Sequence, residues 1–199
     1  CARNTAPCIG LAAAHIARTD PDAVMAVLPA DHHIGDPAGF RRVMAAAAER
    51  AAQGEIVTLG IRPTRPETGY GYIHYDRSDT ALTSQGVEIC TVNRFVEKPP
   101  RDVAERYLAD GGYLWNSGMF FFRAGEMLEA IHAHLPGLGE ALDRFRAAAL
   151  EDEGAVVREL FPTLPSVSID HGVMEKVNEV AVVPADFGWS DLGSFASAW

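Results

Sequence analysis

The sequence has few cysteines, no long apolar run and fewer basic than acidic residues. Its three cysteines are Cys1, Cys8 and Cys90, an odd number without the spacing of metal ligands, so we expect free thiols in a reducing, cytoplasmic compartment. No apolar run is long enough to span a bilayer. The formal net charge of −10 argues against a nucleic-acid surface, although a few local cations or a metal can still hold a phosphorylated small molecule.

Several catalytic motifs are also missing from the sequence. It contains no HExxH, no P-loop, no glycine fingerprint for a dinucleotide and no G-x-S-x-G elbow. His132 and His134 are two residues apart in a predicted helix, where such neighbours face different ways. His32 and His33 lack an evident third ligand. The histidines therefore give no case for zinc.

The first third of the chain predicts alternating helices and strands. Asn4 or Thr5 can cap a helix that continues to about residue 18. The apolar stretch 23–28 does not alternate, which is typical of a strand covered on both faces. Asp36 caps an alanine-rich helix, and a second buried strand follows at 55–61. This order predicts a right-handed βαβ unit.

The rest of the chain continues the α/β pattern. Strands are predicted at 68–76 and 87–98, a short helix at 102–110, and an aromatic strand immediately after Asn116 and Ser117, while 125–160 is mostly helical. A final strand near 178–185 leads through a loop into the start of a helix. With 48% hydrophobic and 22% charged residues, the chain is expected to form an α/β domain whose mixed sheet is flanked by helices.

Polar residues follow several of the predicted strands. In open α/β sheets, ligands gather beyond the carboxyl ends of the strands, where Asp31, Glu97, Lys98 and the aspartates after Val183 are expected. Acidic groups around one pocket repel one another unless a cation joins them, and Mg²⁺ suits carboxylates with few other protein ligands. Each aspartate could also be a helix cap or a solvated turn residue.

Glu97 and Lys98 stand at the end of a predicted strand. Neighbours on an extended chain point to opposite faces, so we expect these two charges not to neutralise each other, and Pro99 is expected to keep Lys98 extended. The alternative is an exposed strand end with solvated charges. Gly71 lets a ligand approach the backbone closely, and the amide of Asn116 can donate and accept, as sugar hydroxyls require.

A family resemblance joins these residues. Almost the whole chain is covered, in order, by the fragments RNTAP, LPADH, GYGYI, RFVEKP, WNSGMF, SIDHGVMEK and GWSDLGS. Together they resemble the mannose-1-phosphate guanylyltransferases, which are sugar nucleotidyltransferases. The resemblance implies a Rossmann-like nucleotide-diphospho-sugar transferase fold with a mixed, mostly parallel sheet. It also implies Mg²⁺-dependent transfer of GMP from GTP to mannose 1-phosphate, which yields GDP-mannose and pyrophosphate.

The resemblance also assigns roles to individual residues. Mg²⁺ would be held by Asp31 and Asp191, and Asp186 would have a supporting role. Lys98 would bind the sugar phosphate. Lys98 and the two metal aspartates would be the catalytic residues. The remaining substrate contacts would come from Glu97, Gly71 and Asn116 on the sugar and from Asn4 and Thr5 on the nucleotide.

The sequence departs from the family in one respect. The glycine- and arginine-rich phosphate loop of these enzymes lies upstream of RNTAP, and residues 1–199 do not contain it. We therefore expect a partial nucleotidyltransferase domain that is N-terminally incomplete, lacks its first βα unit, and is weakly active by itself. Three alternatives stay open: another sugar-1-phosphate nucleotidyltransferase, such as one that makes UDP- or ADP-glucose; a non-catalytic sugar-phosphate-binding fragment; and a truncated piece without a function of its own. Homo-oligomerisation also stays open.

Overall fold

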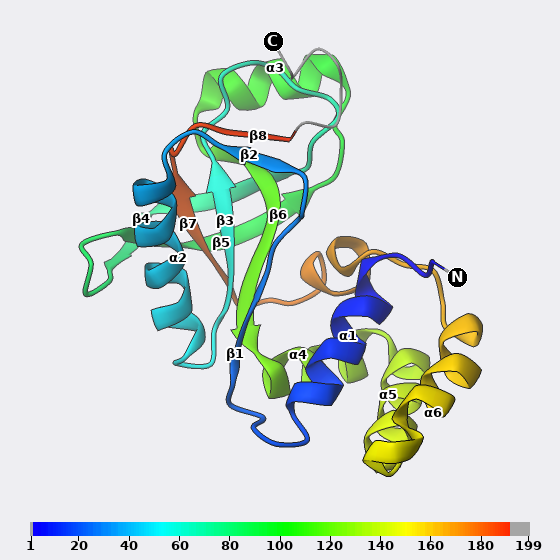
Figure 1. Cartoon of the computed structure of the whole chain (residues 1–199). Coiled ribbons are helices and arrows are strands. Elements are labelled where there is room, and N and C mark those ends of the chain that lie inside the picture. The colour runs from blue at the N-terminus through cyan, green and yellow to red at the C-terminus, as the bar shows by residue number, and fades with distance from the viewer. Residues whose placement is uncertain (1, 192–199) are drawn as a thin grey trace. The chain divides into compact units, whose positions relative to one another are not determined.

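The structure is a computed structural model that describes residues 2–191 (Figure 1). It divides into two compact units, which are treated separately below. The first unit comprises the chain up to residue 25 together with 122–178, and the second comprises 26–121 and the chain from 179 onward. The division falls within β1 (Val24–Val27) and near the end of β6 (Tyr113–Arg123).

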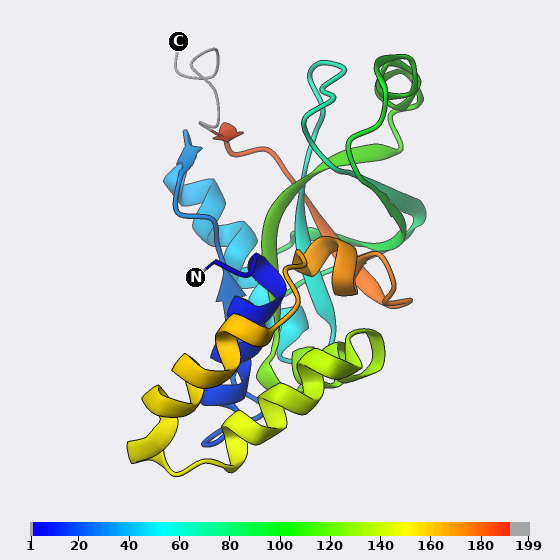
Figure 2. The same ribbon diagram turned by 90° about the vertical axis from the view of Figure 1, so that its right-hand side faces the viewer.

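The first unit is helical, as the sequence predicts (Figure 2). Helix α1 packs against α4 and α5, and the latter also contacts α6. Contact is close at Gly10, where an added Cβ would lie 2.8 Å from Cδ1 of Leu142. The elements are α1 (Thr5–Ile16), α4 (Ala124–His134), α5 (Pro136–Ala147) and α6 (Glu153–Leu160), with short turns η1 (Leu150–Asp152), η2 (Phe161–Thr163) and the π-helical η3 (Asp170–Met174).

The second unit is built on a six-stranded sheet in the order β1-β6-β3-β7-β5-β4, in which β4 also pairs with β6. A mixed sheet flanked by helices is thus confirmed, but the expectation that it is mostly parallel is wrong for the pairings whose direction the structure describes. Of these, β3 and β7 run parallel, whereas β3–β6, β4–β5, β4–β6 and β5–β7 are antiparallel. Apolar runs indicate burial on both faces, which is typical of parallel strands but does not fix the strand direction. The strands are β3 (Ile56–Ile61), β4 (Tyr72–Leu82), β5 (Glu88–Val96) and β7 (Val180–Ala185).

Helix α2 (Pro37–Ala51) and β3 form the core of this unit. Every residue of β3 is buried, as predicted, and Val57 and Leu59 belong to the same apolar cluster as Val43 and Ala47 of the helix. The helix begins at the predicted cap, because the carboxylate of Asp36 accepts hydrogen bonds from two backbone N–H groups of the first turn. Local sequence signals therefore placed this helix correctly.

Strand β1 differs from its prediction. It was expected to be covered on both faces, but Val24 is 37% exposed and Leu28, just beyond the strand, is 41% exposed. The strand stands at one end of the described sheet order, so it has a neighbour on one side. Strand β6 lies between β1 and β3, so the two strands of the predicted βαβ unit are not adjacent.

One further strand boundary was predicted wrongly. Asn116 and Ser117 lie inside β6, which already begins at Tyr113. The hydroxyl of Ser117 donates to the carbonyl of Leu59 at 2.6 Å, so this polar residue is satisfied within the sheet. Pro184 lies inside β7. The residues of β7 for which the structure describes pairing with β5 end before Pro184, so the proline interrupts none of these described pairs.

Helix α3 (Arg101–Asp110) ends as predicted at Gly111, which has a φ of 70° in the left-handed region that favours glycine. The helix start predicted at the end of the chain lies outside the described residues. Cys8 and Cys90 are free thiols, as predicted. Within residues 2–191, no helix has both the length and the apolar character needed to cross a bilayer.

Candidate active site

Two short strands bring the LPADH and GWSD motifs side by side. Strands β2 (His32–Ile34) and β8 (Trp189–Asp191) form a separate antiparallel sheet, in which His32 is in register with Asp191 (Figure 1). Asp31 immediately precedes β2 and Asp191 ends β8, so the antiparallel pairing brings the two predicted metal aspartates to the same end of this small sheet. We call Asp31 together with β2 and β8 the carboxylate clip.

Backbone hydrogen bonds also join the residues between β2 and α2 to the residues just before β8. The N–H of Gly35 donates to the carbonyl of Gly188 at 3.0 Å, and the N–H of Asp36 donates to that of Phe187 at 2.9 Å. Gly188 has a φ of 65°, and an added Cβ would lie 3.1 Å from Cα of Gly35. Glycine is therefore required here, both for the turn and for the close approach that aligns β8 with β2.

A side-chain hydrogen bond also joins the two strands of the clip. The indole N–H of Trp189 donates to Nδ1 of His32 at 3.0 Å, and the two rings meet edge to face. Burial lowers the pKa of His32, and the nearby charges of Asp31 and Asp191 oppose this effect. Because an indole N–H can only donate, Nδ1 must be unprotonated, and the neutral imidazole carries its proton on Nε2. The clip therefore contains a histidine that follows Asp31 in the chain and is in register with Asp191.

Tyr70 connects the GYGYI loop to the clip. Its hydroxyl donates to Oδ1 of Asp191 at 2.6 Å. Burial raises the pKa of Tyr70 to about 12, and the hydrogen bond and charge of Asp191 act in the same direction. Tyr70, Trp189 and His32 were not assigned a role from the sequence, although all three lie inside motifs that also hold assigned residues.

The three residues predicted for the sugar lie together. A Cβ added to Gly71 would be 2.8 Å from Oε2 of Glu97 and 3.4 Å from Cβ of Asn116. The backbone N–H of Asn116 donates to the carbonyl of Gly71 at 2.8 Å, and its side-chain oxygen accepts from the N–H of Gly118 at 3.0 Å. A carboxylate and an amide thus flank bare backbone, which suits hydroxyl groups of a ligand.

The expectation for Glu97 and Lys98 is wrong in its geometry. Nζ of Lys98 lies 3.2 Å from Oε1 of Glu97, and Lys98 has a φ of 41° and is not extended. Strand β5 ends at Val96, so the alternation of an extended chain no longer applies to the next two residues. The lysine side chain is 63% exposed and the glutamate side chain 47%, and such exposed pairs contribute little to stability. A ligand phosphate can therefore replace Glu97 as the partner of Lys98.

Asn4 and Thr5 lie in the first unit and have local partners there. The side chain of Asn4 accepts from the N–H of Thr5 at 2.9 Å, which confirms the predicted helix cap. The hydroxyl of Thr5 accepts from the N–H of Ile169 at 2.8 Å. Their assignment to the nucleotide stays a prediction.

The clip fits a magnesium ion better than a metal with many protein ligands. No group of three or more His, Cys, Asp or Glu side chains suited to a metal occurs within residues 2–191. Asp31 is exposed and Asp191 partly exposed, so each carboxylate has access to solvent. Mg²⁺ is commonly held by one or two carboxylates, with waters and substrate phosphates as the other ligands. The donor set therefore matches this ion.

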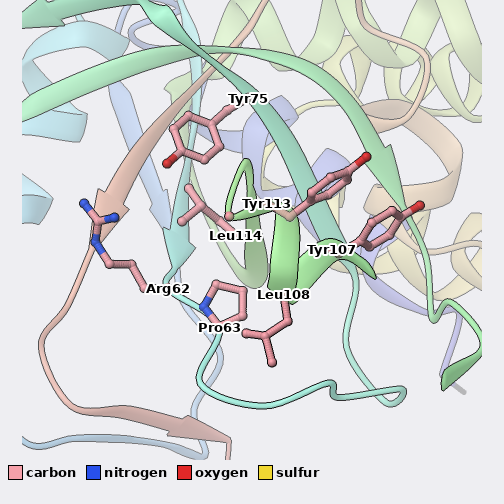
Figure 3. A pocket seen from close by; sticks show the side chains of 8 residues that line it. Arg62, Pro63, Tyr75, Tyr107, Leu108, Tyr113 and Leu114 are labelled. Carbon is pink, nitrogen blue, oxygen red and sulfur yellow. The ribbon is translucent and has the colours of Figure 1, made fainter. Parts of the chain in front are cut away.

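A cavity of about 190 Å³ lies elsewhere in the second unit (Figure 3). Tyr107 and Tyr113 stack in parallel along it, with ring centroids 3.8 Å apart. No residue predicted for the site is among the described residues that line it. They are Arg62, Pro63, Tyr75, Tyr107, Leu108, Gly111, Tyr113 and Leu114.

The fold is α/β, and its small two-stranded sheet brings two of the sequence motifs together. The chain belongs to the nucleotidyl transferase family, whose family model matches residues 1–199. The sequence-based assignment to the sugar nucleotidyltransferases is thereby confirmed at the level of the family.

Similar proteins come from several bacteria. The chain is 44% identical over 197 residues to the xanthan biosynthesis protein XanB of Xanthomonas campestris, a match that covers 98% of this chain and 40% of XanB. It is 44% identical over 201 residues to the mannose-1-phosphate guanylyltransferase of Escherichia coli, covering 99% of this chain and 42% of the relative. A crystal structure from Thermus thermophilus, described as a mannose-1-phosphate geranyltransferase, superposes with a TM-score of 0.85 at 39% identity. The match covers 98% of this chain and 54% of the Thermus thermophilus chain. The chain thus spans about two fifths of the length of these curated relatives.

Proposed function

We propose that the protein containing this chain transfers GMP from GTP to mannose 1-phosphate, giving GDP-mannose and pyrophosphate, with Mg²⁺ as cofactor. The observation that carries the proposal is the carboxylate clip, in which His32 and Asp191 pair in register beside Asp31. The names of the relatives from Escherichia coli and Salmonella typhimurium support the choice of mannose 1-phosphate and guanine nucleotide.

In the proposed reaction, a phosphate oxygen of mannose 1-phosphate attacks the α-phosphorus of GTP. A new P–O bond forms there, and the bond to the β-phosphate oxygen breaks as pyrophosphate leaves. Lys98 would bind the sugar phosphate and reduce the repulsion between two anionic reactants. Glu97 and Asn116 would hold the sugar hydroxyls beside Gly71, which fixes the direction of attack.

Asp31 and Asp191 would hold the magnesium ion. When bound, Mg²⁺ supplies Lewis-acid stabilisation of charge on the phosphates, worth several kcal/mol. Tyr70 and Trp189 maintain the surroundings of these carboxylates through their bonds to Asp191 and His32.

Gly71→Ala is expected to raise KM for mannose 1-phosphate about tenfold, on the scale of one lost hydrogen bond to a charged group. The new methyl group would displace the carboxylate of Glu97, which lies 2.8 Å from the Cβ position. The side chain of Glu97 is flexible and half exposed, so the melting temperature should hardly change. Steady-state kinetics with each substrate varied will check this, and an equal rise in KM for GTP would contradict the sugar role.

Product analysis tests the proposed function. The full-length protein with Mg²⁺ is incubated with GTP, UTP or ATP and with mannose 1-phosphate or glucose 1-phosphate. We expect GDP-mannose and pyrophosphate to form fastest. Preferred formation of UDP- or ADP-glucose would show that the substrates are another nucleotide and sugar phosphate. Calorimetric binding of mannose 1-phosphate without any turnover would favour a binding fragment.

The 199-residue chain, tested beside the full-length protein, is expected to have kcat/KM lower by about a hundredfold or more. Equal values would contradict that expectation.

A further inference from the structure

Tyr70 links the metal carboxylate to the sugar loop. Its hydroxyl lies 2.6 Å from Oδ1 of Asp191, the distance of a charge-assisted O–H···O⁻ bond. The next residue, Gly71, contacts the residues predicted for the sugar through its carbonyl bond to the N–H of Asn116. Tyr70 therefore stands where the two halves of the proposed site meet.

The ring of Tyr70 is also held by packing against two tryptophans. It meets Trp115 edge to face with centroids 5.2 Å apart, and Trp189 at 5.3 Å. Trp115 is 3% exposed, and the guanidinium of Arg65 lies over it at 5.3 Å. A phenol fixed in this way presents its hydroxyl at a defined place before any ligand binds.

A carboxylate has two oxygens, and the bond from Tyr70 uses one of them. Oδ1 of Asp191 accepts the hydrogen bond from the hydroxyl of Tyr70, while Oδ2 keeps the capacity to bind a cation. The backbone of Asp191 is set independently by its register with His32 across the clip. Backbone and side chain are thus each fixed by a different part of the second unit.

We infer that Tyr70 is a positioning residue for the divalent-cation site, because its hydroxyl orients the carboxylate of Asp191. The inference rests on the proposed magnesium site. Hydrogen-bond partners of metal-binding carboxylates commonly set metal affinity by about 10- to 100-fold. Tyr70 would touch neither the cation nor the substrates, and it would act through Asp191 alone.

The test is a Mn²⁺ titration of the full-length protein followed by electron paramagnetic resonance, with the metal alone as the probe. Tyr70→Phe keeps the packed ring and removes the hydroxyl, so the fold should survive, and tryptophan fluorescence and thermal melting will check this. Tyr75→Phe is the control, since it removes one hydroxyl from a buried tyrosine of the same unit. Asp191→Asn reports whether the carboxylate binds the metal.

We expect Tyr70→Phe to weaken Mn²⁺ binding about 10- to 100-fold and Tyr75→Phe to leave it unchanged. If Asp191→Asn weakens binding but Tyr70→Phe does not, the positioning role is overturned while the metal site stands. If Asp191→Asn has no effect, the metal site itself is wrong and the inference fails with it. An equal loss in both tyrosine variants would also overturn the inference, because it would reflect general destabilisation.

Discussion

Replacement of Asp191 by Asn is expected to lower kcat by about a hundredfold or more, with a loss of Mg²⁺ dependence. Loss of one well-placed electrostatic contact commonly costs 10²–10³ in rate, roughly 2.7–4 kcal/mol. Asn has nearly the size of Asp, and its carbonyl oxygen can still accept the hydroxyl of Tyr70, so the change removes charge with little change in packing. Rates measured across a Mg²⁺ series at saturating substrates will show the effect.

Asp186→Asn is the matched control for this experiment. Asp186 is an exposed aspartate in the loop between β7 and β8, five residues before Asp191 in the chain, and it lies outside the clip. Because only a supporting role is expected for Asp186, its loss of activity should be far smaller than that of Asp191→Asn. Asp31→Asn should behave like Asp191→Asn, and survival of activity and Mg²⁺ dependence in both clip variants would show that the metal assignment is wrong.

Lys98→Ala is expected to raise KM for mannose 1-phosphate by about 10- to 100-fold and to change KM for GTP far less. The size is that of a charge-assisted hydrogen bond, roughly 1.5–3 kcal/mol. The lysine has a φ of 41°, an uncommon conformation for a residue other than glycine, and such conformations cluster at functional sites. Its partner in the structure is an exposed glutamate that a phosphate can replace.

Arg101→Ala controls for the general loss of a positive charge near this position. Arg101 also forms an exposed ion pair, with Glu105 one turn later in α3, and it has no proposed substrate role. Initial rates with each substrate varied in turn will separate the two KM values. A Lys98→Ala variant with equal increases for both substrates would assign the lysine to general electrostatics and not to the sugar phosphate.

Local elements of the fold could be predicted because their causes are local. Asp36 caps α2 through bonds to the next turn, and Gly111 closes α3 with a left-handed φ. Strand direction and neighbours depend on distant segments instead. The insertion of β6 between β1 and β3 leaves no local mark in either strand, so the mostly parallel sheet was predicted wrongly.

The candidate site, too, could be predicted only where the signal is local in the sequence. The motifs predicted Asp31 and Asp191, which lie in the carboxylate clip, and the sugar residues, which lie together around Gly71. Tyr70 and Asp191 are 121 positions apart, and Trp189 and His32 are 157 apart, so a single sequence gives no sign that they pair. The extended conformation predicted for Lys98 was wrong for another reason. The alternation of an extended chain was assumed for residues that lie beyond the end of strand β5.

Asp31 and Asp191 are proposed to hold one cation together across the carboxylate clip. The most direct measurement is a double-mutant cycle on Mn²⁺ affinity with Asp31→Asn, Asp191→Asn and the double variant. A shared ion predicts that each single change weakens binding strongly and that the double variant is little worse than either. Independent, multiplying effects, or a single variant with unchanged affinity, would contradict a shared site.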